Sequence, residues 1–141
     1  MEISAAFLCD FAEVREGLLM ALGGGTTRLW RAEYPASMGS SLALLIDLLQ
    51  SDLDAPHEIV VAIQGPDEPV GEVKGTFHIG GSPDLKAGEN VVAPLAIDLR
   101  PVQLPAEGSY SINISIDGQF IRTVGFVAQP PASQPGSSAN E

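Results

Sequence analysis

Residues 110–126 constrain the fold more than any other stretch, because large apolar and small polar side chains alternate along them. A period of two is typical of a β-strand with one buried and one wet face. The apolar set is Tyr110, Ile112, Ile114 and Ile116, followed by Phe120, Val124 and Phe126. Asp117 and Gly118 interrupt the pattern with residues that favour turns. The stretch therefore predicts a β-hairpin.

The length of the turn decides which residues of this hairpin share a face. A two-residue turn on Asp117 and Gly118 would put Phe120 on the wet face. A three-residue turn that includes Ile116 would pair Ile114 with Phe120 and gather the large side chains on one face. Since a shift of one residue moves a whole set of side chains to the other face, burial favours the three-residue turn. We expect Phe120 on the same face as Ile114.

The rest of the chain carries short apolar runs separated by glycine, proline and acidic turns. Strands are predicted at residues 18–22, 26–34, 57–64, 70–79 and 91–99, and loops at 80–90 and 100–108. Residues 3–12 and 40–50 fit either a helix or a strand, and a strand is preferred. About eight or nine strands predict an all-β antiparallel sandwich with Greek-key connections, of the immunoglobulin or C2 kind. This domain would span residues 1–129, with a disordered Pro/Ser/Gly-rich tail at 130–141.

Charge and cysteine content exclude several functions. The chain has 18 acidic and 7 basic residues, a formal charge of −11. Nucleic acids and anionic membranes are therefore not expected as partners, because both bind basic surfaces. Cys9 is the single cysteine and cannot form an intrachain disulfide. Without a signal-peptide pattern or a long apolar run, these features predict a cytoplasmic protein.

Candidate chemistry is sparse. Gly23–Gly25 lacks the lysine of a phosphate loop and predicts a tight turn. His57 follows a proline at a strand entry, where a surface or edge role is expected. Ser40 and Ser41 lack a nucleophile-elbow motif. Five carboxylates in predicted loops could together bind calcium, which prefers oxygen ligands. Their spacing matches no known calcium-binding motif. They are Asp52, Asp54, Asp67, Glu68 and Asp84. We expect no enzyme activity, cofactor or metal; a small-ligand or calcium-binding module that uses these acidic loops is the alternative.

One predicted strand face carries residue types that are common at protein interfaces. Arg28, Trp30 and Tyr34 share a face if residues 26–34 form a strand. The alternative is that Trp30 and Tyr34 fill the core. The expected function is a non-catalytic interaction or accessory domain. Its partner would be another protein, or a second copy that pairs through an edge strand.

Turn and strand residues carry a resemblance to a known family. They are Ala6–Ala12, Gly17, Gly23-Gly24, Tyr34-Pro35, His57-Glu58-Ile59, Gly108-Ser109-Tyr110, Ile116-Asp117-Gly118 and Phe126-Val127. In this order they resemble DUF6941, an uncharacterised bacterial family, over residues 3–128. The resemblance implies a cytoplasmic β-sandwich with no established activity. It also implies that residues 3–12 and 40–50 are strands.

Overall fold

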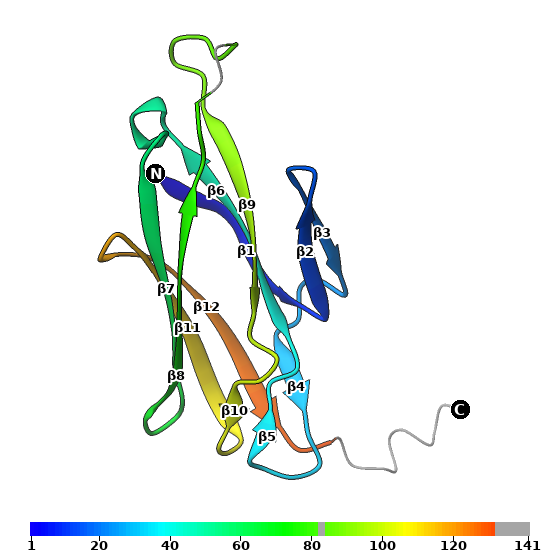
Figure 1. The fold of residues 1–141 in the computed structure, drawn as a ribbon. Coiled ribbons are helices and arrows are strands. Elements are labelled where there is room, and N and C mark those ends of the chain that lie inside the picture. The colour runs from blue at the N-terminus through cyan, green and yellow to red at the C-terminus, as the bar shows by residue number, and fades with distance from the viewer. Residues whose placement is uncertain (82–83, 132–141) are drawn as a thin grey trace.

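The computed structural model describes residues 1–81 and 84–131, which form an all-β structure (Figure 1). Its elements, in chain order, are β1 (Glu2–Cys9), β2 (Phe11–Arg15), β3 (Leu18–Leu22), β4 (Arg28–Trp30), β5 (Ala36–Ser37), β6 (Ser41–Leu48), η1 (Gln50–Asp52), β7 (Pro56–Gln64), β8 (Pro69–His78), β9 (Val91–Asp98), β10 (Gln103–Leu104), β11 (Gly108–Ile116) and β12 (Gln119–Gln129). The predicted tail lies outside the described residues, except for Pro130 and Pro131.

Two sheets enclose one hydrophobic core. The smaller has the order β1-β6-β9 and the larger the order β4-β12-β11-β7-β8. Their neighbouring strands are antiparallel except β4, which runs parallel to β12. The core cluster takes its residues from both sheets, among them Leu42, Leu44, Ile112 and Ile114, all fully buried. Two short pairs, β5–β10 and β2–β3, lie outside these sheets.

Alternation in the sequence explains the central strands. Tyr110, Ile112, Ile114 and Ile116 of β11 are buried, and the serines and asparagine between them are only half-buried. The strand β6 is buried at most positions on both faces. The β2–β3 hairpin lies beside β9 and β6 and accounts for this second covered face. Residues 3–9 and 41–48 are therefore strands, which excludes the helix alternatives.

The predicted register at the tip of the last hairpin is wrong. Asp117 and Gly118 both have positive φ, and they form a two-residue turn in which Ile116 pairs with Gln119. Phe120 then pairs with Ser115, on the face opposite Ile114, and is 59% exposed. A bulge at Ile121 inserts one residue, so Ile112 pairs with Val124 and Tyr110 with Phe126. The bulge returns Phe126 to the core, which the turn alone would not allow.

Two other expectations need correction. The described residues contain twelve strands rather than eight or nine, because short pieces such as β5 and β10 pair on their own and β1 and β2 are separated at Asp10. The predicted strand at 26–34 is only three residues long, Arg28–Trp30, and the chain turns before the cis peptide bond between Tyr34 and Pro35. Among the described residues, no helix has the length and apolar character that crossing a membrane requires.

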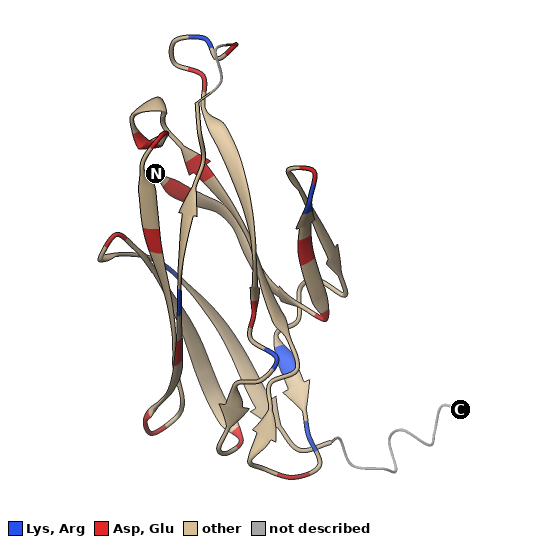
Figure 2. Ribbon diagram, in the orientation of Figure 1, with Lys and Arg blue, Asp and Glu red and all other residues tan. Residues whose placement is uncertain are grey.

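Acidic side chains lie mainly at the turns at both ends of the molecule, and Lys and Arg are few (Figure 2).

Candidate functional site

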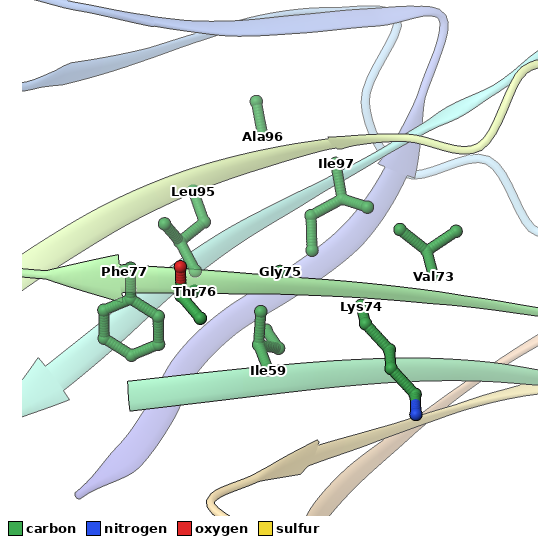
Figure 3. A pocket seen from close by; sticks show the side chains of 9 residues that line it. All are labelled: Ile59, Val73, Lys74, Gly75, Thr76, Phe77, Leu95, Ala96 and Ile97. Atoms are coloured by element: carbon green, nitrogen blue, oxygen red, sulfur yellow. The ribbon is translucent and has the colours of Figure 1, made fainter. Parts of the chain in front are cut away.

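A small apolar groove runs between the two sheets where β8 faces β9 (Figure 3). Its volume is about 180 Å³, and its walls include Ile59, Val73 and Phe77 from one sheet and Leu95 and Ile97 from the other. The side chain of Lys74 extends from β8 away from β9 (Figure 3). The groove therefore offers apolar contact but no convergent polar groups, which binding sites for small polar molecules usually contain.

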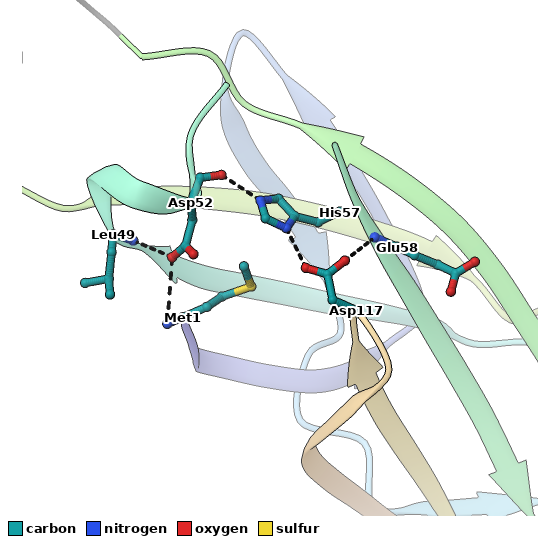
Figure 4. A network of polar contacts seen from close by, with 6 residues as sticks. All are labelled: Met1, Leu49, Asp52, His57, Glu58 and Asp117. Carbon is teal, nitrogen blue, oxygen red and sulfur yellow. Dashed lines mark hydrogen bonds and ion pairs between the residues drawn. The ribbon is translucent and has the colours of Figure 1, made fainter. Parts of the chain in front are cut away.

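A cluster of polar contacts is built on His57, at the start of β7 (Figure 4). The His57 Nδ1 lies 2.7 Å from Asp117 Oδ2, and its Nε2 lies 2.6 Å from the backbone oxygen of Asp52. Asp117 Oδ1 also accepts the backbone N–H of Glu58 at 3.0 Å. The ring of Phe77 is 5.4 Å from the His57 ring, centroid to centroid. His57 thus joins the η1 turn to the β11–β12 turn. It is buried, at 9% exposure, and the expected surface role is wrong.

Both partners of His57 accept hydrogen bonds, which determines its charge. A carbonyl oxygen and an ionised carboxylate have no proton to donate, so both ring nitrogens must carry one. The hydrogen bond to Asp117, followed by that to the Asp52 carbonyl, raises the pKa of His57 above its ordinary value. The same bond from His57, together with the Glu58 amide, lowers the pKa of Asp117. The cluster therefore favours an imidazolium paired with a carboxylate.

A histidine bonded to an aspartate also occurs in catalytic triads, but this geometry does not match one. In a triad the second ring nitrogen faces the nucleophile. Here the Nε2 of His57 is already hydrogen-bonded to the backbone oxygen of Asp52. Ser40 precedes β6 and Ser41 is its first residue, and both are buried. His57 lies near the other end of β6, because its ring is bonded to Asp52, which follows that strand. An eight-residue strand spans about 25 Å. The cluster acts as a structural link between turns.

The acidic loops do not gather at one place. Asp52 and Asp54 lie at the His57 end, and Asp67 and Glu68 lie in the β7–β8 turn at the other end (Figure 2). The Asp52 carboxylate accepts the Leu49 amide, and that of Asp54 accepts the Gly81 amide, each at 2.9 Å. Over residues 1–81 and 84–131, no three His, Cys, Asp or Glu side chains are placed to hold a metal. Calcium binding stays a prediction that no contact in the described residues favours.

The predicted contact residues Arg28, Trp30 and Tyr34 do not form one strand face. Arg28 and Trp30 lie on β4, and Trp30 is 49% exposed, so the alternative that it fills the core is wrong. Tyr34 lies beyond the strand, packs partly on the core and donates its hydroxyl to the Gln129 oxygen at 3.0 Å. Arg28 also bonds Gln129, through its side chain at 2.7 Å. Their role in partner contact stays a prediction.

What sequence reasoning missed is the exposure of the β2–β3 hairpin, since strands were predicted at residues 3–12 and 18–22. Residues 18–22 read as a buried strand, yet Leu18 and Leu22 are 62% and 67% exposed. The register places Phe11 opposite Leu22, Glu13 opposite Met20 and Arg15 opposite Leu18, so all six share a face. No residue of this hairpin belongs to the core cluster formed by the described residues. The sequence of an apolar run bounded by glycines does not indicate whether other strands will bury it.

One of two comparisons with known proteins places the chain in a family. No match is found among curated proteins. A family model described as "Family of unknown function (DUF6941)" matches residues 4–129. The match covers β2 to β12 and nearly all of β1. The chain therefore belongs to DUF6941, a family of unknown function.

Proposed function

We propose that this protein is a non-catalytic interaction domain that contacts a protein partner through its β2–β3 hairpin. The observation that carries the proposal is the face of the hairpin on which four exposed apolar side chains lie around the Glu13–Arg15 ion pair. Phe11, Leu18, Met20 and Leu22 expose between 38% and 67% of their surface on it. Contiguous exposed apolar patches on a soluble protein mark interaction sites more often than scattered single residues do.

The exposed surface is large enough to matter energetically. Burying one large apolar side chain stabilises by about 1.5–3 kcal/mol. The exposed fractions of the four side chains together correspond to about two whole side chains, or about 3–6 kcal/mol for complete coverage. Association costs about 4–15 kcal/mol in lost translational and rotational freedom. The hairpin would therefore supply a substantial part of a partner's affinity, with further contacts around it.

We also propose that the fold is a Greek-key sandwich of the immunoglobulin kind. Without the short strands, the orders β1-β6-β9 and β12-β11-β7-β8 match the A-B-E and G-F-C-C′ sheets of such domains. Tyr110, near the start of β11, donates its hydroxyl to the backbone oxygen of Ala106, which matches a tyrosine corner. On this assignment the β2–β3 hairpin is an insertion after the first strand. The exposed side chains of this hairpin, beyond its contacts with β6 and β9, support a role in addition to folding.

Cys9, the single cysteine, is fully buried and unpaired, and its burial raises the pKa of the thiol. A domain without a disulfide supports our proposal of a reducing, cytoplasmic compartment.

Affinity capture with a paired set of variants tests the interaction role. Leu18→Ser combined with Leu22→Ser makes the hairpin polar, and Phe120→Ser changes an equally exposed residue on β12. Wild type and Phe120→Ser are expected to retain the same binding partner, and the hairpin variant to lose it. Circular dichroism checks that all three fold. If the hairpin variant recovers the same proteins as wild type, the proposal is wrong.

A further inference from the structure

The strand β3 has an open edge that differs from the open edges of β8 and β9. It pairs with β2 only, among the strands that the structure describes. A strand with one neighbour leaves alternate N–H and C=O groups unpaired along its other side. Charged side chains and prolines protect such edges: Glu72 and Lys74 lie on β8, and Pro94 lies on β9. The sequence of β3, Leu-Leu-Met-Ala-Leu, has neither.

The side chains of β3 are also nearly symmetric about its centre. Leu18 and Leu22 are both leucine and lie two residues before and after Met20. The symmetry is not exact, because Leu19 on one side of Met20 is larger than Ala21 on the other. If two copies of β3 paired antiparallel about Met20, Leu18 would face Leu22 of the other copy. Leu19 would face Ala21. Each cross-strand pair would be apolar, and apolar side chains that pack against each other across strands stabilise a sheet.

The charges of the hairpin lie away from this edge. Glu13 and Arg15 are on β2 and form an ion pair at 3.1 Å, and Glu16 is in the turn. Two copies of a chain with a formal charge of −11 repel each other. An edge without charges is where that repulsion opposes contact least, because salt screens charges more than about 8 Å apart at physiological ionic strength.

From this placement we propose that the partner is a second copy of this chain, paired through β3. A two-fold axis at Met20 joins the hairpins into one four-stranded sheet in the order β2-β3-β3-β2. The contact is isologous, so it closes a dimer and does not propagate into a filament. This inference rests on the proposed interaction role of the hairpin.

Sedimentation equilibrium of the purified full chain tests the inference, with Met20→Lys and Phe120→Lys as a matched pair. Wild type and Phe120→Lys are expected to be dimers. Met20→Lys removes two Met side chains that the dimer would bury and places two ammonium groups opposite each other, each beside one carboxylate, that of Glu13. It should weaken the dimer about tenfold or more, because apolar burial is lost and like charges directly opposite on paired strands are destabilising. Higher salt should strengthen the wild-type dimer, since it screens the net charge.

Met20→Cys provides a second readout that does not depend on a lost function. Residues directly opposite each other on paired strands have Cβ atoms about 4.5–5.5 Å apart, near the separation that a disulfide needs. Under oxidation Met20→Cys should form a covalent dimer and Phe120→Cys should not. The buried Cys9 is common to both variants.

The outcomes separate this inference from the proposed function. A wild-type chain that stays monomeric at all concentrations overturns self-pairing. A dimer that Met20→Lys leaves intact overturns it as well. In either case the hairpin can still bind a different protein, and the capture experiment with Leu18→Ser and Leu22→Ser then decides the interaction role alone. A dimer that is lost in Met20→Lys and cross-linked in Met20→Cys confirms both.

Discussion

Replacing His57 by glutamine should change how stability depends on pH. The folded state holds His57 as an imidazolium between Asp117 and the Asp52 carbonyl, and these bonds raise its pKa. The folded protein therefore binds this proton more tightly than the unfolded chain does. The stabilisation is complete below the unfolded pKa of about 6.5 and is lost as pH rises through the higher folded value. Across that window, wild-type stability should fall as pH rises.

The structure bounds the size of the effect. A hydrogen bond to a charged group contributes about 1.5–3 kcal/mol. The Asp117 side chain is 50% exposed, so water replaces part of what is lost there. We expect His57→Gln to reduce the free energy of unfolding by about 1–3 kcal/mol at pH 6 and by less at pH 9. For a single proton the slope cannot exceed about 1.4 kcal/mol per pH unit.

Urea unfolding followed by circular dichroism, at half-unit steps from pH 6 to pH 9, measures this slope. His78→Gln is the matched control, because His78 is the only other histidine and is exposed at the end of β8. The control should keep the wild-type slope in this range, whereas His57→Gln should flatten it. The reasoning is refuted if wild-type stability rises from pH 6.5 to 8, or if His57→Gln retains the wild-type slope.

Four other substitutions test the fold. Gly108 has φ of +142°, and a Cβ added there would lie 2.5 Å from Pro66 Cγ, so Gly108→Ala should cost about 1–3 kcal/mol in thermal unfolding. Tyr110→Phe removes the hydroxyl bonded to Ala106 but keeps the ring, and chemical denaturation should show a loss of about 1 kcal/mol. Leu44→Ala, at a fully buried site, should cost about 2–5 kcal/mol, whereas Leu18→Ala on the hairpin should stay within about 1 kcal/mol. Equal losses for the two leucines would contradict the assignment of the hairpin to the outside of the core.

Local patterns predicted the strands well because their causes are local. The alternation from Tyr110 to Ile116 corresponds to β11, and the glycines near Leu18 and Leu22 correspond to the ends of β3. The turn at Asp117 and Gly118 was found, but its length was not. The prediction assumed that burial of Phe120 decides the register. In the structure Phe120 stays exposed, and the bulge at Ile121 shifts the register so that the residues after it pair with the buried side of β11.

The candidate sites could not be predicted as well, because they depend on contacts far apart in sequence. His57 and Asp117 are separated by 60 residues, and only the meeting of two turns brings them together. Leu18–Leu22 is as apolar as a core strand, so its exposure follows from its place outside both sheets. Trp30 is exposed for a similar reason, since β4 lies at the edge of the larger sheet.

Because residues 11–22 hold no part of the core cluster, the exposed face of the β2–β3 hairpin is a surface that evolution or engineering could rewrite, as long as the contacts with β6 and β9 are kept. Its flanking strand β1 and the Leu8–Thr26 bridge anchor both ends of the insertion on the body of the domain. A different sequence at this position could alter specificity while the scaffold is inherited unchanged. The same division of labour lets loops on antibody frameworks diversify.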